Sequence, residues 1–288
     1  MKTSDVYLRT QGEEADFERG SVFFVGTATV IISYGGFKIL TDPNFLHAGD
    51  HVHLGYGLTS KRLTNPAIEI QDLPDIDFML LSHLHGDHFD RVAETRLNKT
   101  MPIITTGHAA QYLEGRAFRP PVALDTWEDV TIRKGMGAWV RVTAMPGTHA
   151  PGPLRKVLPP VMGSMLEFGD AGEDEARLRM YITGDTLIHK ELKEIPQRYP
   201  EIDLALLHLG GTRVLGIMVT MDAKQGVEAM RIIDPKAAIP IHYNDYSVFK
   251  SPLEDFKQAV NEAGFEDRVH YLAHGETHEF EVSTARQR

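Results

Sequence analysis

The feature that most constrains this 288-residue chain is a run of histidines and an aspartate that directly follows a stretch of apolar residues. The apolar stretch is Phe78-Met79-Leu80-Leu81, and after Ser82 comes His83-Leu84-His85-Gly86-Asp87-His88. Consecutive apolar residues are typical of a strand buried on both faces, so the histidines should lie where the chain leaves a sheet. Imidazole nitrogens and carboxylate oxygens are ligands of zinc and similar divalent metals. The run therefore predicts a metal site at the end of a buried strand.

The composition and charge of the chain limit the partners that we expect. Hydrophobic residues make up 42% and charged residues 24% of the sequence, as in an ordinary soluble globular protein. We find no run of about 18 apolar residues that could span a membrane, and no apolar centre of a secretory signal near the first residue. The net charge of −10 repels the phosphates of nucleic acid, so we do not expect a nucleic-acid partner. The lack of cysteine excludes disulfides and thiolate ligands and fits the cytoplasm; the oligomeric state stays open, a homo-oligomer included.

Apolar runs that predict strands recur along the whole chain, and no linker or low-complexity tract divides it. Several of these runs are continuous rather than alternating, which indicates strands covered on both faces. We therefore expect one domain over residues 1–288, of the α/β class, with sheets inside and helices outside. The predicted strands are residues 22–25, 29–33, 37–41, 78–82, 103–105, 139–144, 164–168, 179–183, 204–207, 238–242 and 269–272.

Signals at helix ends predict three helices between these strands. Asp222, with Gln225 three residues later, should open a helix over residues 223–233. Ser251 and Glu254 form a capping box with Pro252 at the first helical position, and Gly264 should end that helix. A third helix is expected over residues 90–97.

Two long segments, residues 44–74 and 147–163, are rich in Gly and Pro and show little periodicity. Loops of this length inside a compact domain are usually functional. We expect both to form walls or a lid of a pocket, the alternative being tolerated surface insertions.

Further along, His149, Asp185 and His242 follow the histidine run in the chain, in the segments Pro146-Gly-Thr-His149, Gly184-Asp185-Thr186 and Pro240-Ile-His242. Together with the H-x-H-x-D-H run, these segments resemble the metallo-β-lactamase fold superfamily. The similarity extends from about residue 21 to residue 280 and is closest to the branch of the ascorbate-6-phosphate lactonases and N-acyl-phosphatidylethanolamine phospholipases. It implies an αββα four-layer sandwich with mixed sheets, helices outside and metals at one edge of the sheets.

The resemblance also implies a set of metal ligands. His83, His85 and His149 would hold a first divalent ion, Asp87, His88 and His242 a second, and Asp185 would bridge the two. Zinc is the expected metal, with manganese or iron as alternatives. A hydroxide shared by the ions would be the nucleophile, since bound metal lowers the pKa of water from 15.7 to about 7, and Asp87 would be the catalytic residue that orients it. True β-lactamases generally lack an aspartate at the position of Asp185, so antibiotic hydrolysis is not expected.

Each later ligand has a simpler alternative. His149 lies among Gly and Pro residues and is compatible with a turn histidine. Asp185 is compatible with an N-cap of the segment that begins at Thr186. His242 is compatible with a core histidine, and His274 competes with it as the last ligand; His242 is favoured because it ends an apolar strand.

A second group of polar residues is predicted to shape the pocket. Asp42 resembles a family position that supports the site from behind, which implies that it would accept the second N–H of a ligand histidine. His53, Tyr56, His208 and Tyr243 are candidates to protonate the leaving group, and each is equally compatible with surface or core packing. His208 also departs from what the family usually carries at its position.

These observations favour a dinuclear metal-dependent hydrolase that cleaves a small-molecule ester, lactone or phosphodiester. The alternatives are an iron-dependent oxidoreductase or dioxygenase on the same fold, because the same ligands suit iron, and a catalytically inactive scaffold. The scaffold is disfavoured because all seven ligand candidates are present.

Overall fold

The computed structural model describes residues 4–8, 15–54, 59–135, 137–152, 158–173, 175–214 and 216–282. Two seven-stranded mixed sheets form its centre, in the orders β1-β10-β11-β12-β13-β14-β17 and β18-β2-β3-β4-β7-β8-β9. The strands of the first are β1 (Ser4–Leu8), β10 (Asp129–Lys134), β11 (Ala138–Pro146), β12 (Met162–Gly169), β13 (Leu178–Ile182), β14 (Leu204–His208) and β17 (Ala237–Ile241). Those of the second are β18 (Thr277–Glu281), β2 (Arg19–Gly26), β3 (Thr29–Tyr34), β4 (Phe37–Thr41), β7 (Phe78–Leu81), β8 (Ile103–Thr105) and β9 (Val122–Ala123).

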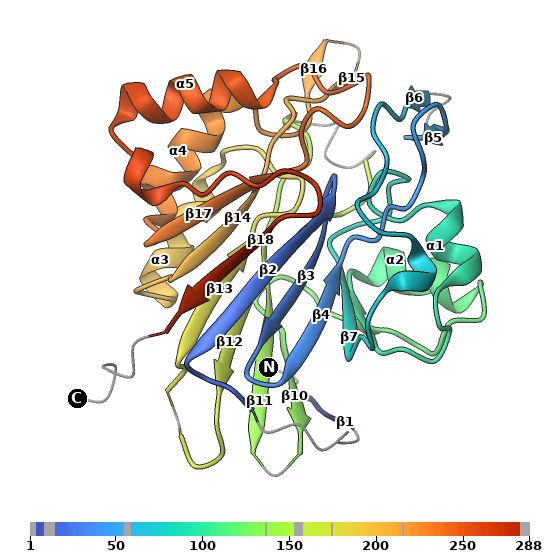
Figure 1. Cartoon of the computed structure of the whole chain (residues 1–288), viewed down its shortest axis with the longest axis vertical. Helices are drawn as coiled ribbons and strands as arrows, with labels where there is room; N and C mark the ends of the chain where they lie inside the picture. Colours follow the sequence, from blue (N-terminus) through green and yellow to red (C-terminus); the bar gives the residue numbers. More distant parts are fainter. Residues whose placement is uncertain are drawn as a thin grey trace.

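Helices cover the outer face of each sheet. Figure 1 shows α3, α4 and α5 on one side of the molecule and α1 and α2 on the other. The helices are α1 (Arg91–Arg96), α2 (Gly107–Glu114), α3 (Glu194–Arg198), α4 (Ala223–Ile233) and α5 (Leu253–Ala263), with short 3₁₀ turns η1 (Ile70–Asp72), η3 (Lys190–Lys193) and η4 (Glu266–Arg268). No helix within the described ranges is long and apolar enough to cross a membrane.

The buried side chains divide into layers that match this arrangement. The largest cluster joins side chains of both sheets, among them Ile32 of β3 and Leu166 of β12. A second cluster packs the other face of β3, β4 and β7 against α1 and α2, and a third packs β14 and β17 against α4 and α5. The four-layer αββα sandwich expected from the sequence is therefore confirmed.

Strand β7 illustrates why continuous apolar runs were a useful signal. Phe78 and Leu80 point into the cluster between the sheets, whereas Met79 and Leu81 point into the cluster beneath α1 and α2. Since successive side chains of a strand alternate between its faces, a strand covered on both faces needs apolar residues at every position.

One predicted strand, residues 269–272, is wrong. Only Val269 pairs, through a single bridge to Ala238, and the chain then leaves the sheet. The last strand of the described chain is β18, in which exposed residues alternate with half-buried ones at the edge of its sheet. An edge strand with one face in solvent carries a weaker apolar pattern than a central strand, so it was missed.

The helix starts agree with the sequence signals in part. Asp222 caps α4 by accepting a hydrogen bond from the Gln225 backbone N–H at 3.0 Å, and Gly264 ends α5 with a φ of 70°. Pro252, however, is the N-cap of α5 and not its first helical residue. The Ser251 hydroxyl accepts from the backbone N–H of Ala223 at the start of α4, at 3.0 Å, so the predicted capping box is wrong.

Strand direction brings the candidate ligands to one edge. Strands β4 and β7 run parallel, as do β13, β14 and β17, and β11 has the direction of β13 because both are antiparallel to β12. The carboxyl ends of these strands therefore lie at the same edge of each sheet. Two short hairpins, β5–β6 (His51–His53 and Thr59–Lys61) and β15–β16 (Arg213–Val214 and Ile217–Met218), lie beyond that edge at one end of the molecule (Figure 1). The single-domain organisation of residues 1–288 stays a prediction.

Candidate metal centre

Three of the predicted ligands form a tight group of imidazoles. His83 and His85 follow β7, and His149 follows β11. The Nδ1 atom of His85 lies 3.0 Å from Nε2 of His83 and 3.0 Å from Nε2 of His149. Nitrogens bound to one zinc ion at about 2.0–2.1 Å in a tetrahedral arrangement lie roughly 3.3 Å apart. The spacing of the three nitrogens is thus close to that of a zinc site.

The protonation of this group leaves the inward nitrogens free to bind a cation. His149 Nδ1 lies 2.8 Å from the Val219 carbonyl, which can only accept, so Nδ1 carries the hydrogen and Nε2 has a lone pair. The Ser82 hydroxyl donates to Asp42, so it accepts from Nδ1 of His83, 2.9 Å away. Burial lowers the pKa of His83, His149 and His85, the last to about 3. Neutral imidazoles are the form that binds metal.

The second group contains Asp87, His88 and His242, which can all direct one ligand atom to a common point. His242 follows β17, and its Nδ1 donates to the Leu209 carbonyl at 2.9 Å, so Nε2 faces Asp87 Oδ2 at 3.4 Å. Burial alone would lower the pKa of His88, but Asp185 and Asp42 raise it well above its usual value. A carboxylate on either side therefore compensates a positive charge at this position.

Asp185 lies between the two groups. It follows β13, and its Oδ1 atom is 3.4 Å from His88 Nε2, within reach of His83 as well. Burial opposes its ionisation, but His242 and His88 lower the pKa of Asp185 well below its usual value. The residues after it are not helical until η3, so the alternative that Asp185 caps a helix is wrong.

Several buried polar atoms of these residues have no hydrogen-bond partner in the described part of the chain. They include Oδ1 of Asp87, Oδ1 of Asp185 and Nε2 of His88. Buried polar atoms in folded proteins are almost always paired, because an unpaired one forfeits its interaction with water. Divalent cations would satisfy the Asp185 oxygen and the His88 nitrogen, and a water molecule beside them would satisfy the Asp87 oxygen, so the residues fit the metal ions that the sequence implies.

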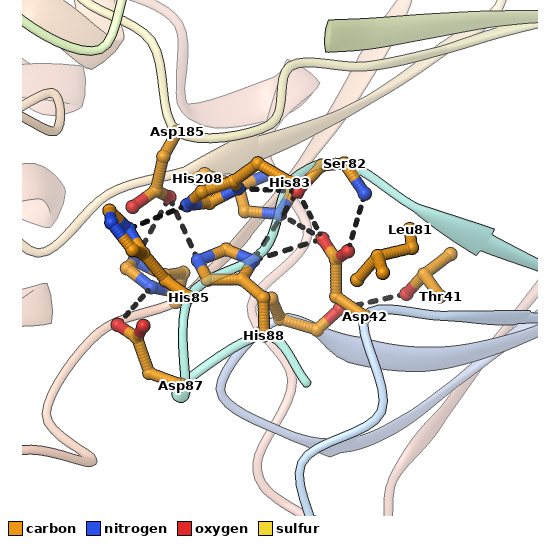
Figure 2. A network of polar contacts seen from close by, with 12 residues as sticks. Thr41, Asp42, Leu81, Ser82, His83, His85, Asp87, His88, Asp185 and His208 are labelled. Atoms are coloured by element: carbon orange, nitrogen blue, oxygen red, sulfur yellow. Dashed lines mark hydrogen bonds and ion pairs between the residues drawn. The ribbon is translucent and has the colours of Figure 1, made fainter. Parts of the chain in front are cut away.

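Asp42 contacts the histidine run through Ser82 and His88. Figure 2 shows its carboxylate beside Ser82, His88 and His208. It accepts from the Ser82 backbone N–H at 2.7 Å and from the Ser82 hydroxyl at 2.9 Å, and His88 Nδ1 lies 3.1 Å away. Although burial opposes ionisation, His88 and His208 lower the pKa of Asp42 to about 2. The ionised carboxylate thus directs Nε2 of His88 toward the second group.

His208 also lies in this supporting layer. It ends β14, is fully buried, and places Nδ1 3.2 Å from the Thr183 hydroxyl and Nε2 3.4 Å from Asp42 Oδ2. Its ring stacks on that of His88, with centroids 5.8 Å apart. His208 is therefore placed behind the ligands, not over them where a leaving group would be protonated.

The other candidate proton donors have different positions. His53 is exposed on β5. The Tyr243 hydroxyl donates to the Leu272 carbonyl at 3.0 Å and its ring packs between the sheets, so the prediction that it faces the pocket is wrong. Tyr56 lies outside the described residues. His274 lies 3.2 Å from the Asp245 carboxylate, which makes it a partner of Asp245 and not a competitor of His242.

The pocket over the ligands is lined by residues from three loops. Leu54 comes from the first long segment and Leu158 from the second, so both segments supply walls as expected. The third wall, formed by Thr212, Val214 and Val219 around the β15–β16 hairpin, was missed. Its strands have two residues each, too few to show a period in the sequence. His85, Asp87, His149 and Asp185 form the floor.

Two further residues that the sequence did not indicate contact the ligands directly. The Thr220 hydroxyl donates to Asp185 Oδ2 at 2.8 Å, and the Val219 carbonyl accepts from His149. Gly184 allows the turn before Asp185: its φ is 62°, and a Cβ atom there would lie 2.7 Å from the Met162 carbonyl oxygen.

Comparison with known proteins agrees with this geometry. The model of the beta-lactamase superfamily domain matches residues 38–243. A metal-dependent hydrolase of Thermus thermophilus is 28% identical over 260 residues, which cover 88% of this chain and 96% of the relative. The structure of an isothiocyanate hydrolase from Delia radicum gut bacteria has a TM-score of 0.75 at 21% identity, covering 91% of this chain and all of that one. A diiron β-hydroxylase from Streptomyces venezuelae shares the fold with a TM-score of 0.63 at 15% identity, over 94% of this chain and 55% of that one.

The family model spans most of the chain, from β4 to the residue after His242, and so includes every candidate ligand. The solved structures add agreement in fold across nearly the whole length. The chain therefore belongs to the beta-lactamase superfamily, among its metal-dependent hydrolases.

Proposed function

We propose that the protein is a hydrolase that uses two divalent metal ions to cleave an ester, lactone or phosphodiester bond of a small molecule. His83, His85 and His149 would hold the first ion, Asp87, His88 and His242 the second, and Asp185 would bridge them. Zinc is our first choice because neutral imidazole dominates the ligand set, with manganese or iron as alternatives. The observation that carries the proposal is the approach of His83 Nε2 and His149 Nε2 to His85 Nδ1, 3.0 Å each, above buried carboxylates that keep an oxygen unpaired within the described residues.

Bound metal would supply a water molecule of lowered pKa and would polarise the bond to be cleaved. Asp87 is the catalytic residue that we assign: its Oδ1 atom has no hydrogen-bond partner among the described residues, and the side chain lines the pocket floor. That oxygen can accept a hydrogen from the attacking water and so orient it toward the substrate. Asp42 and Thr220 keep His88 and Asp185 in position during the reaction.

The walls indicate how a substrate is held. Leu54, Leu158, Val214 and Val219 offer aliphatic contacts to an apolar part of the molecule. The Thr212 hydroxyl is buried, lines the same pocket and has no partner in the part of the chain that the structure describes, so it can donate to a substrate oxygen. These features support a small substrate with an apolar group beside the scissile bond. We expect such a molecule to be met in the cytoplasm, because a chain without cysteine suits a reducing compartment.

Within the superfamily we place the chain near the lactonase and phospholipase branch, since Asp185 offers a carboxylate between the two metal sites. The second candidate function is iron-dependent oxidation, which is favoured by one observation: a diiron β-hydroxylase has the same fold. The inactive scaffold is disfavoured because the candidate ligands converge.

The deciding experiment is a metal analysis of natively purified protein followed by an activity screen against lactones, thioesters and phosphodiesters. Two equivalents of zinc or manganese with turnover of one substrate class would support hydrolysis. Iron together with substrate-dependent oxygen uptake would favour oxidation instead. A protein that is fully folded yet binds no divalent metal would refute the proposal.

A further inference from the structure

We infer that Arg62, a buried arginine behind the metal centre, is a positioning residue that fixes the ligands of the second metal relative to one another. Arg62 follows β6, and its exposed fraction is 0%. A buried arginine usually has its charge and its donors paired. In Arg62, Nε and Nη1 donate hydrogen bonds, whereas Nη2 has no hydrogen-bond partner among the described residues. The inference rests on the proposed two-metal function.

The guanidinium of Arg62 contacts three other segments of the chain, around Thr27, Asn44 and Tyr246. Its Nη1 donates to the Thr27 hydroxyl and to the Asn44 side-chain oxygen, and its Nε donates to the Thr64 carbonyl at 3.0 Å. The guanidinium also lies over the ring of Tyr246, 5.1 Å from its centroid. Thr27 and Asn44 are each one hydrogen bond away from a metal-ligand loop.

Asn44 connects Arg62 to the histidine run. Its Nδ2 donates to the Gly86 carbonyl at 3.0 Å, between His85 and Asp87. Its Oδ1 accepts from both Arg62 and the Tyr246 hydroxyl, the latter at 3.0 Å. Because Oδ1 is held by two donors, the amide cannot turn over, and its NH₂ group stays directed at Gly86.

Thr27 connects Arg62 to His242. The Thr27 carbonyl accepts from the backbone N–H of His242 at 2.6 Å. His242 has a φ of 61°, which is unfavourable for a residue with a Cβ atom and persists only where its surroundings hold it. Since Arg62 holds the Thr27 side chain, it supports the backbone that presents His242 to the second metal.

Asp245 supplies the counter-charge for this network. It is buried, and its Oδ2 atom accepts from the Thr27 backbone N–H at 2.6 Å. Burial opposes its ionisation, but His274 and Arg62 lower the pKa of Asp245 below its usual value. The charges of Arg62 and Asp245 therefore compensate each other around Thr27.

Two of the three ligands of the first metal group, His83 and His149, are held by residues outside the Arg62 network. The Ser82 hydroxyl holds His83, and the Val219 carbonyl holds His149. Loss of Arg62 should thus weaken the second metal and leave the first largely unchanged. This selectivity separates a positioning role from a general contribution to stability.

The test is zinc titration of the metal-free protein by calorimetry, with metal content measured after gel filtration, for the wild type and for Arg62→Met. We expect two zinc ions in the wild type, and in Arg62→Met one ion of unchanged affinity with the second bound about 10–100-fold more weakly, the range known for residues that support metal ligands. Arg62→Lys keeps the positive charge but cannot make the guanidinium contacts to Thr27, Asn44 and Thr64 together. Its affinity for the second zinc should lie between those of the wild type and Arg62→Met. Arg179→Met removes an arginine that contacts Glu167 of β12 and the Pro200 carbonyl in the loop before β14, and is the matched control with both affinities unchanged.

The outcomes are distinguishable. A wild-type protein that binds only one ion contradicts the proposed two-metal function. A wild type with two ions and an Arg62→Met variant that also binds both normally, or that loses both equally, overturns the role of Arg62. Should Arg62→Met fail to fold by circular dichroism, Asn44→Ala removes the contact to Gly86 and the acceptor shared by Arg62 and the Tyr246 hydroxyl. Unchanged binding of the second zinc in that variant would equally overturn the inference.

Discussion

The hydroxyl of Thr220 donates a 2.8 Å hydrogen bond to the carboxylate of Asp185, the residue that lies between the two groups of metal ligands. The residue before it, Val219, both lines the pocket and accepts a hydrogen bond from His149 through its carbonyl. One short segment therefore contacts the substrate space and two ligands at once. Movement of Val219 and Thr220 on substrate binding would therefore shift His149 and Asp185.

Removal of the Thr220 hydroxyl should lower the metal affinity of the site without replacing any of its candidate ligands. Thr220→Val has nearly the same volume but leaves Asp185 Oδ2 without its donor. We expect metal affinity or activity to fall about 10–100-fold, as for other partners of metal ligands. Thr220→Ser keeps the hydroxyl and should retain most of the affinity in the same titration. Equal zinc affinity of Thr220→Val and wild type would show that Asp185 is held by other means.

Asp87 should be essential for turnover but not for folding. Asp87→Asn removes the negative charge and replaces one of the two acceptor oxygens by an NH₂ donor, so we expect turnover to fall by about two to four orders of magnitude, the range for a lost general base. The circular dichroism spectrum should not change. Asp72→Asn, an exposed substitution in η1, serves as the control with normal activity. Normal turnover by Asp87→Asn would assign catalysis to a different residue.

Metal removal should abolish activity reversibly and lower thermal stability. A ligand that binds only the folded state stabilises it by about 2.7 kcal/mol at a hundredfold excess over its dissociation constant, so the chelated protein should melt at a lower temperature. Activity and melting temperature should both return when zinc or manganese is added. An enzyme that keeps full activity after exhaustive chelation is incompatible with a metal-dependent reaction.

Gly184 should resist substitution more than an ordinary turn glycine does. Gly184→Ala combines a positive φ with a Cβ atom 2.7 Å from the Met162 carbonyl, and we expect the free energy of unfolding to drop by about 1–3 kcal/mol. Gly172 has a φ of 80°, but no atom of the described residues lies within 4 Å of the position that a Cβ atom would take, so Gly172→Ala tests the effect of conformation alone. Urea denaturation of the two variants measures how much of the lost unfolding free energy comes from the close contact and how much from the backbone strain. Equal losses of unfolding free energy in the two variants would mean that the Met162 carbonyl moves away from the added Cβ atom without an energetic cost.

Local patterns predicted the α/β class and the position of the first candidate ligands, whereas the four-layer sandwich was expected from family resemblance. The apolar residues of β7 and the histidines directly after them stand in one short stretch of chain. The contributions of His149, Asp185 and His242 depend on strands that meet only in the folded molecule, and they were assigned through family resemblance. Geometry now brings them together, although their role as ligands stays a proposal.

What the sequence did not reveal has physical reasons. The β15–β16 hairpin is too short to show a period, and β18 is half exposed at an edge. Arg62 is a single charged residue in a loop, where solvent exposure is the ordinary expectation. Its burial depends on Asn44, Thr27 and Asp245. These residues are distant from Arg62 in the sequence, so no local pattern predicts that they are its partners.

The candidate ligands lie at the ends of strands that belong to two packed sheets, whereas Leu54, Leu158, Thr212, Val214 and Val219 line the pocket above them. Substitutions at these wall residues would change the shape of the pocket while the candidate metal ligands keep their positions. New substrates can therefore be acquired in such a scaffold without rebuilding the chemistry beneath.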